Sequence, residues 1–143
     1  MAKSGSIIVI EDDEDDVEFL RDTLKQLGED NKLIWFNNTS LAWDYLTNTT
    51  ERPFIILCDV NLPVQNGIEF KKSLDADPVL RKKSIPFIFY STSVDQRYVN
   101  TAYTEMTVQG FFQKGYDFKD MVATIKVIMD YWKLSKHPNS PGY

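Results

Sequence analysis

The amino-acid sequence predicts one α/β domain built around a parallel β-sheet of five strands. Short apolar runs, of the length of buried strands, alternate along the chain with segments whose apolar residues recur at helical spacing. Strands and helices that alternate in this way form parallel sheets through right-handed crossovers. The chain of 143 residues contains no internal repeat and leaves no room for a second domain. We therefore expect a single domain over residues 7–134, with a disordered segment at 1–6 and a flexible tail at 135–143.

The first half of the chain supplies two strands and two helices. Four β-branched aliphatic residues in a row predict a strand at 7–10. Apolar residues at helical spacing up to Leu27 predict the helix that follows, and Gly28 is a suitable helix stop. A second apolar run at 33–36 predicts the next strand. Polar residues just before 41–46 are of the types that cap helices, so a helix is expected there.

The second half supplies three strands and their helices. Residues 54–58 form an unbroken apolar run, which suits a strand buried on both faces. Gly67 opens a helix that ends near Leu74, and a short turn is expected at 79–80. The remaining elements are a strand at 86–90, a helix at 94–106, a strand at 110–114 and a helix at 118–132. The helix at 94–106 is only weakly patterned, whereas the apolar residues of the last helix form a clean stripe with a spacing of 3.6 residues.

Composition and charge exclude several classes of function. The net charge of −5 and the pI near 4.8 argue against a nucleic-acid partner held by phosphate contacts. No apolar run is long enough to cross a bilayer, and the N-terminus lacks the pattern of a signal peptide. Cys58 is the one cysteine, so neither an internal disulfide nor a cysteine-based metal site is available. We expect a cytoplasmic protein without membrane or nucleic-acid partners.

Polar side chains follow four of the five predicted strands. Glu11 and Asp12 come after the first strand, Asp59 after the third, Ser91 after the fourth, and Lys114 ends the fifth. The carboxyl ends of parallel strands meet at one edge of a sheet, where α/β proteins bind their ligands. Three converging carboxylates repel one another and need a cation, and oxygen ligands without His or Cys favour Mg²⁺. The acidic residues 14–16 have a simpler explanation, because they suit the positive end of the helix that they begin.

The same set of side chains suits phosphoryl transfer. A lysine and a hydroxyl beside the carboxylates are able to stabilise the oxygens of a phosphoryl group, alongside the metal ion. Asp59 would then act as the nucleophile and form an aspartyl phosphate. Taken one at a time, each of these residues has an ordinary explanation: Ser91 as a turn residue, Lys114 as a surface lysine, and Asp59 as an acidic residue at a strand end.

Together these motifs resemble the receiver domain of two-component response regulators, of the CheY type. The resemblance rests on Ile10-Glu11-Asp12, on Asp59-Val60-Asn61-Leu62-Pro63 followed by Gly67, on Ser91-Thr92 and on Lys114. It extends over nearly the whole chain, from Ile7 to about Trp132. It implies a flavodoxin-like (βα)5 fold, a doubly wound parallel sheet with the strand order 2-1-3-4-5.

The resemblance also implies a role for each of these residues. Asp59 would accept a phosphoryl group from a phosphohistidine on a sensor histidine kinase or a phosphotransfer protein. Asp12 and Asp59 would bind Mg²⁺, with Glu11 acting through water and the Asn61 backbone carbonyl as a further ligand. Ser91 would bond to the phosphoryl group and Lys114 would pair with it. The aromatic residue of the family's switch falls on Phe111, which is expected to change rotamer as Ser91 moves.

The sequence departs from the family pattern at three positions. Gly115 stands where the family usually has a proline after the lysine, so the conformation of that loop is open. Thr92 is larger than the residue often found there and is expected to narrow access to Asp59. The first acidic residue is Glu11 rather than aspartate, which gives it a longer reach. None of the three removes a group that the chemistry requires.

Three functions compete for this chain. The favoured one is a stand-alone response regulator that signals by altered protein–protein contacts. The alternative is a pseudo-receiver, a binding module that works without phosphorylation; it would be favoured by loss of Asp12, Asp59 or Lys114, all of which are present. A Mg²⁺-dependent phosphatase of small molecules ranks third, because Asn61 cannot serve as the general acid that it needs.

Partners are predicted less sharply. Residues 77–86 resemble the short regulators that are paired with phytochrome-like histidine kinases. The apolar stripe that ends in Tyr131-Trp132 is compatible both with a homodimer through the last helix and with simple core packing. His137, the one histidine, lies in a proline-containing tail and is expected to be exposed to solvent. The downstream target, the phosphate lifetime and the identity of the kinase are not encoded in a recognisable pattern.

Overall fold

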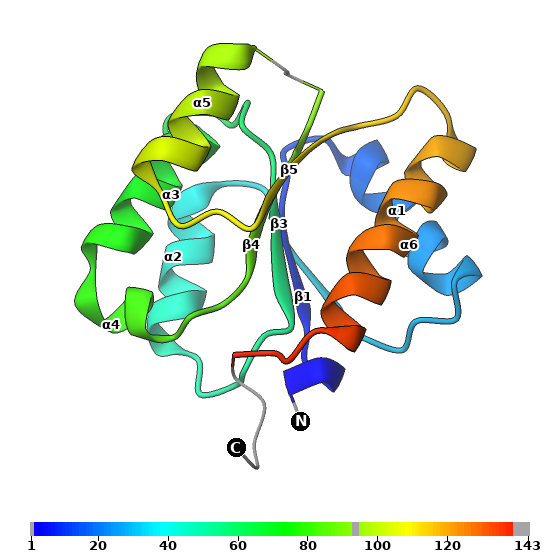
Figure 1. The fold of residues 1–143 in the computed structure, drawn as a ribbon, viewed down its shortest axis with the longest axis horizontal. Helices are drawn as coiled ribbons and strands as arrows, with labels where there is room; N and C mark the ends of the chain where they lie inside the picture. The colour runs from blue at the N-terminus through cyan, green and yellow to red at the C-terminus, as the bar shows by residue number, and fades with distance from the viewer. Residues whose placement is uncertain (1, 93–94, 139–143) are drawn as a thin grey trace.

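The computed structural model of the chain describes residues 2–92 and 95–138. Within them, five parallel strands form one sheet in the order β2-β1-β3-β4-β5, with helices on both faces (Figure 1). The predicted α/β fold and strand order are confirmed. The strands are β1 (Ile7–Ile10), β2 (Leu33–Phe36), β3 (Ile55–Cys58), β4 (Phe87–Ser91) and β5 (Gly110–Gln113).

The helices form two layers, one on each face of the sheet (Figure 1). On one face lie α1 (Glu14–Gln26) and α6 (Phe118–Leu134), which pack against each other. On the other face lie α2 (Thr39–Asn48), α3 (Gly67–Ala76), α4 (Pro78–Lys82) and α5 (Gln96–Glu105). Alternate residues of β1 enter opposite apolar clusters: Ile8 and Ile10 pack with the second group of helices, and Ile7 and Val9 with the first. Both faces of the central strands are therefore buried.

Short polar side chains fix the starts of the helices. Each α-helix is preceded by an Asp or Asn whose side chain accepts a backbone N–H of the first turn. At residues 79–80 the sequence predicts only a short turn, but the structure has the short helix α4 over Pro78–Lys82. Asp77 accepts the N–H groups of Val79 and Leu80, and Pro78 fits the first helical position. The predicted helix 94–106 corresponds to α5, and Val94 lies outside the described residues.

The apolar stripe of the last helix is mainly core. Met121, Ile125, Ile128 and Met129 are buried against β1, β3 and β4. Trp132 is partly buried and packs on the same cluster, whereas Tyr131 is 61% exposed. Trp132 thus contributes to the core, whereas Tyr131 lies on the surface. None of the helices within the described residues combines the length and the apolar character that a membrane span requires.

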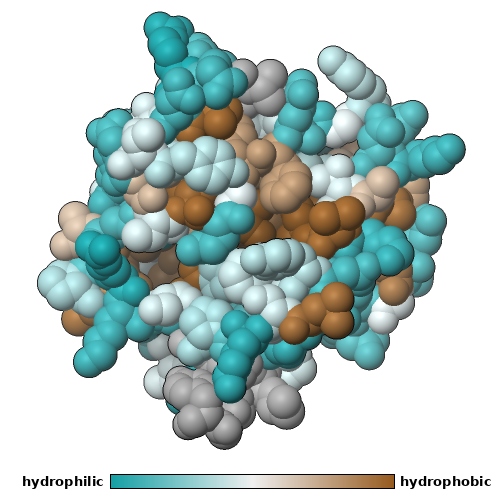
Figure 2. Space-filling model, viewed as in Figure 1, coloured by the Kyte–Doolittle hydropathy of each residue, from teal (hydrophilic) through white to brown (hydrophobic). Residues whose placement is uncertain are grey.

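One edge of the sheet keeps apolar surface. β5 is an edge strand, and its Phe111 and Phe112 are only partly buried, against opposite faces of the sheet. The same view of the surface shows hydrophobic residues gathered near its middle, between polar side chains of the flanking helices (Figure 2). Three residues of α6 add exposed apolar surface: Val127, Tyr131 and Leu134.

The segment after α6 corrects a prediction made from the sequence. His137 is 1% exposed, so the expectation of a solvent-exposed histidine is wrong. Its Nε2 lies 2.5 Å from the Phe54 carbonyl oxygen, its ring stacks on Phe54, and Trp132 meets it edge-on. Residues 135–138 therefore return to the sheet, because two aromatic rings and one carbonyl group together satisfy both the apolar body and the polar edge of the His137 imidazole.

The opposite end of the chain is also ordered where it is described. The expected disorder over residues 1–6 differs from the structure, in which Ala2–Ser4 form a 3-10 helix. Asn31 donates its side-chain amide to the carbonyls of Lys3 and Gly5, and the Lys3 ammonium donates to the Lys133 carbonyl. These contacts hold the segment against the domain.

Burial of His137 predicts a pH dependence of stability. Burial lowers the pKa of His137, against the raising effect of its hydrogen bond to Phe54. The unfolded chain then binds more protons than the folded one as the pH falls below about 6.5, the usual histidine pKa. We expect the free energy of unfolding to fall over that acidic range, with a slope of less than one proton. Urea titrations at several pH values give the free energy of unfolding of the wild type and of His137→Gln, and the difference between them isolates the contribution of His137. The same dependence on pH in both proteins would contradict the prediction.

A buried ion pair ties α3 to the segment after α5. The Lys71 ammonium donates to Asp75 Oδ1 at 2.8 Å and to Thr107 Oγ1 at 3.1 Å, and lies 5.0 Å from the centre of the Phe87 ring. Asp75 also accepts the Thr107 backbone N–H at 2.9 Å. Burial by itself raises the pKa of Asp75, but the hydrogen bonds from Lys71 and Thr107 outweigh it and lower the pKa. The carboxylate therefore stays ionised inside the fold.

Candidate functional site

Strand register brings the predicted site residues to one edge of the sheet. Ile10 pairs with Cys58 on the neighbouring strand, so Glu11 and Asp59 leave β1 and β3 at the same level. Ser91 closes β4, and Lys114 directly follows β5, where its N–H donates to the Ser91 carbonyl at 2.9 Å. The carboxyl edge of the sheet thus collects the groups that the sequence pattern predicts to lie there.

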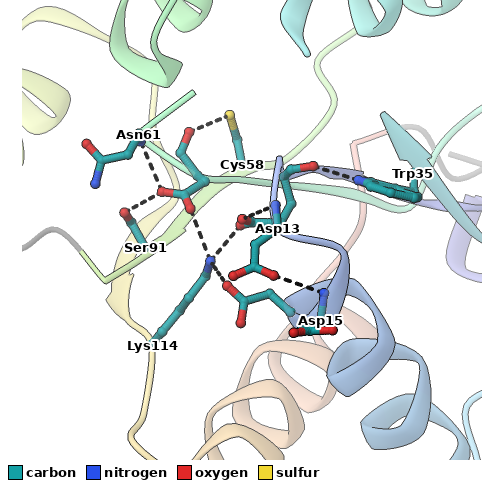
Figure 3. A network of polar contacts seen from close by, with 10 residues as sticks. Asp13, Asp15, Trp35, Cys58, Asn61, Ser91 and Lys114 are labelled. Atoms are coloured by element: carbon teal, nitrogen blue, oxygen red, sulfur yellow. Dashed lines mark hydrogen bonds and ion pairs between the residues drawn. The ribbon is translucent and has the colours of Figure 1, made fainter. Parts of the chain in front are cut away.

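The ammonium group of Lys114 is the centre of this edge (Figure 3). It donates to Glu11 Oε2 at 2.6 Å, to Asp16 Oδ2 at 2.8 Å and to Asp59 Oδ2 at 3.1 Å. The lysine side chain is 4% exposed. An ammonium group has three protons, and all three are used here. Lys114 is therefore a site residue rather than an ordinary surface lysine.

The two carboxylate oxygens of Asp59 have different surroundings. Oδ2 faces Lys114, whereas Oδ1 accepts the Ser91 hydroxyl at 2.5 Å and the Asn61 backbone N–H at 3.1 Å. Figure 3 shows Ser91 and Asn61 on the side of this carboxylate away from the α1 residues. Asp59 is 6% exposed. These donors fix the orientation of the carboxylate, which a reacting group needs.

Burial and charge make Glu11 and Asp59 different acids. Burial raises the pKa of Glu11 to about 8, with a further rise from Asp59 and against the lowering effect of Lys114. Burial also acts to raise the pKa of Asp59, but the charge of Lys114 and hydrogen bonds from Glu11 and Ser91 outweigh it and lower the pKa. Glu11 thus holds a proton more readily than Asp59, and the surroundings of Asp59 favour its ionised form. Burial by itself lowers the pKa of Lys114, but the charges of Glu11 and Asp59 raise it above its usual value.

Three carboxylates are placed to hold a divalent cation. Glu11, Asp12 and Asp59 each present one oxygen, and all three oxygens lie within 4.8 Å of one another. Glu11 and Asp59 are buried and Asp12 is exposed, so the group opens to solvent on one side. A set of oxygen donors with an open side fits Mg²⁺, which prefers oxygen ligands and keeps several waters. The residues present therefore suit the ion that the sequence pattern predicts.

Phe111 is partly buried and packs against the apolar core, away from the carboxylates. Its ring packs 5.3 Å from that of Phe89, its partner across β4 and β5. The structure thus brings five of the predicted residues together around Asp59, and holds Phe111 one layer away in the cluster that faces α2 to α5.

Two glycines allow close approaches at this edge. A Cβ atom at Gly67 would lie 2.1 Å from the Asp59 backbone oxygen, so only glycine lets α3 begin beside Asp59. At Gly115 a Cβ atom would lie 2.3 Å from the Cβ of Asp120, in the first turn of α6. The departure from the usual proline after Lys114 therefore has a local reason: the start of α6 occupies the space that a larger residue needs.

The sequence analysis missed Asp16 as a site residue. Its carboxylate makes the second-shortest contact of Lys114, and the side chain is 24% exposed. Acidic residues at the start of a helix already have an explanation in the helix dipole, and this explanation hid a specific contact. The available signal was spacing: Asp13 caps α1, so Asp16 lies in the first turn of the helix, close to the end of the preceding strand β1 in the sequence.

The comparisons with known proteins identify this arrangement. A family model described as the response regulator receiver domain matches residues 7–126. This chain belongs to that family. Receiver domains of response regulators are signalling proteins rather than enzymes. The resemblance to CheY-like receivers noted in the sequence is thereby confirmed.

Similar receivers include regulators named for phytochromes. Response regulator Rcp1 of Synechocystis sp. (strain ATCC 27184 / PCC 6803 / Kazusa) is 28% identical over 131 residues, which cover 88% of this chain and 87% of Rcp1. A solved structure of the Mn²⁺-bound form of Rcp1 superposes with a TM-score of 0.81 at 27% identity, covering 93% of this chain and 98% of that one. The phosphorylated cyanobacterial phytochrome response regulator RcpA has the same fold, with a TM-score of 0.84 at 24% identity, over 94% of this chain and 98% of RcpA.

Proposed function

We propose that this receiver domain accepts a phosphoryl group on Asp59 and signals through altered contacts with other proteins. The observation that carries the proposal is the environment of Asp59: an ionised, oriented carboxylate beside one lysine, one hydroxyl and two further carboxylates. A carboxylate held only for structure would need no cluster of like charges around it, because converging carboxylates repel one another.

The proposed step conserves atoms and charge. An oxygen of Asp59 attacks the phosphorus of a phosphohistidine on the partner, a P–O bond forms, and the P–N bond breaks. The imidazole leaves with the electron pair of that bond and takes up a proton from solvent. Ser91 donates its hydroxyl and Lys114 its ammonium to phosphoryl oxygens, so both exchange a contact to Asp59 for a contact to the product.

Glu11, Asp12 and Asp59 would hold Mg²⁺, with Glu11 acting through water and the Asn61 backbone carbonyl as a further ligand. When bound, the ion neutralises part of the charge of the phosphoryl group. Phe111 is proposed as the switch aromatic: loss of the Ser91 contact to Asp59 would loosen the end of β4, and Phe111 packs on Phe89 of that strand.

The partner that donates the phosphoryl group is proposed to be a sensor histidine kinase or a phosphotransfer protein. Rcp1 is similar over most of its length, and RcpA is named as a phytochrome response regulator, which supports a kinase of the phytochrome-like type. A homodimer through the last helix, α6, stays a proposal, and it would use the exposed apolar residues of that helix. A cytoplasmic location is proposed with it.

Intact-mass analysis after incubation with acetyl phosphate tests the phosphoacceptor function. We expect a single phosphoryl adduct that forms with Mg²⁺, is absent when EDTA removes the ion, and is released by neutral hydroxylamine, which cleaves acyl phosphates. An adduct that resists hydroxylamine would place the phosphoryl group on another residue type. Absence of both an adduct and binding of beryllofluoride with Mg²⁺ would favour the pseudo-receiver, a binding module that does not need phosphate.

A further inference from the structure

Asp16 competes with the proposed product for the same ammonium group. Its Oδ2 lies 2.8 Å from Lys114 Nζ, closer than Asp59 Oδ2 at 3.1 Å. Unlike Glu11 and Asp59, it is not one of the three carboxylates that group around a cation position in the described residues. Binding of a metal ion therefore gives Asp16 no new partner and leaves its hold on Lys114 in place.

The three contacts of Lys114 respond differently to phosphorylation. The contact to Asp59 is exchanged for one to the phosphoryl group, and Glu11 gains the metal ion as a second positive partner. The contact to Asp16 has no such replacement. The phosphoryl oxygen takes the ammonium proton that Asp59 releases, but it attracts an ammonium group that Asp16, with its full charge, still holds at 2.8 Å.

A buried hydroxyl near Lys114 has no hydrogen-bond partner among the described residues. Among the described residues, Tyr90 Oη is the buried side-chain polar atom for which no hydrogen bond is found, although the residue is 2% exposed. Lys114 Nζ lies 6.0 Å from the centre of its ring. Burial, and after it the charge of Asp16, raises the pKa of Tyr90 to about 12, against the effect of Lys114, so the hydroxyl keeps its proton. A buried unpaired donor is costly and calls for an acceptor in another state.

We propose that Asp16 is a positioning residue that holds Lys114 in the unphosphorylated protein and competes with the phosphoryl group for it, and that Tyr90 donates to Asp16 when the ammonium moves. The inference rests on the proposed phosphoacceptor function and adds to it a residue that sets the affinity for the phosphoryl group. By holding Lys114, Asp16 favours the unphosphorylated state. Tyr90 reduces this preference, because it stabilises the Asp16 carboxylate after Lys114 has moved to the phosphoryl group.

Titration with beryllofluoride, an analogue of the phosphoryl group, tests this role. At saturating Mg²⁺ we expect Asp16→Asn to bind the analogue about three- to tenfold more tightly than the wild type, since one competing charge is gone. Mg²⁺ alone should bind about two- to fivefold more weakly, because a nearby negative charge is lost and Lys114 turns fully to Glu11 and Asp59. Tryptophan fluorescence reports both, since the Trp35 indole N–H donates to the Glu11 carbonyl at 2.6 Å.

The opposite signs separate this role from a structural one, because a loosened fold would weaken both affinities. Asp22→Asn, an exposed acid on the same helix, is the matched control for net charge and should change either affinity less than about twofold. As a single substitution, Tyr90→Phe should weaken binding of the analogue. Added to Asp16→Asn, it should leave the affinity for the analogue unchanged.

Each remaining outcome counts against a defined part of the proposal. Equal or weaker analogue binding by Asp16→Asn, or an equal gain in Asp22→Asn, would overturn the role of Asp16. An unchanged affinity in Tyr90→Phe would overturn the role of Tyr90. A wild-type protein that binds no analogue would overturn the phosphoacceptor function itself, and the wild-type curve shows this before any variant is compared.

Discussion

Replacement of Asp59 by asparagine is expected to abolish formation of the phosphoryl adduct completely. Asparagine keeps the size of the side chain and is able to accept the Ser91 hydroxyl and the Asn61 N–H, so the local packing is retained. It lacks the anionic oxygen that attacks phosphorus, and no other group at the site replaces it. Intact-mass analysis with acetyl phosphate and Mg²⁺ measures the effect, which is the loss of the whole signal rather than a slower rate.

The control for this variant is Asp44→Asn, which removes an exposed carboxylate on α2, on the surface of the domain. We expect this control to form the adduct to the wild-type extent. An adduct of equal yield in Asp59→Asn would show that another side chain is the acceptor, and peptide mapping would then locate it. A thermal melt of both variants verifies that the loss is chemical and not a failure to fold.

The largest effect on stability is expected at Lys71, far along α3 from the proposed acceptor. Lys71→Met should lower the free energy of unfolding by about 3 kcal/mol, because it removes a buried ammonium group and leaves the partly buried Asp75 carboxylate without its cation. The corresponding drop in melting temperature is about 10 °C for a domain of this size. Urea unfolding measures the free energy of unfolding. An unchanged m-value, the slope of this free energy against urea concentration, indicates that the unfolded state is not altered.

Two further variants sharpen this measurement. Lys72→Met removes the neighbouring lysine, whose pair with Glu105 is half exposed, and should cost less than about 0.5 kcal/mol. The double variant Lys71→Met/Asp75→Leu should recover part of the loss, since an apolar pair replaces a single buried charge. If Lys71→Met were no more harmful than Lys72→Met, the ion pair would not stabilise the fold.

The sequence predicted the fold and most of the site because both depend on local patterns. Strands buried on both faces leave apolar runs, and Asp59 and Lys114 follow such runs directly, so their meeting at one edge is a consequence of parallel topology. The strand order came from the family resemblance. Residue roles such as that of Phe111 come from the same source and stay predictions.

Contacts that depend on distant segments were not predictable. Lysine is seldom buried, and the sequence shows only that Lys71 has Asp75 four residues later on the same helix; the burial of this pair depends on Thr107 and Phe87, which only the fold brings to it. His137 follows the last helix in a stretch with the composition of a tail. Its burial depends on Phe54, which lies 83 residues earlier in the sequence. Asp16 was not predicted as a site residue for another reason. Its position in the first turn of α1 is already explained by the favourable interaction of acidic residues with the helix dipole.

The contacts of residues 2–6 and of His137 have a practical consequence for protein engineering. Both segments are fixed at the edge of the sheet opposite to Asp59, since His137 binds the Phe54 carbonyl just before β3 and Lys3 reaches the end of α6 (Figure 1). A reporter protein or an affinity tag fused before residue 2 or after residue 138 would therefore leave from the far side of the domain. The acidic edge around Asp59 stays accessible in such a fusion.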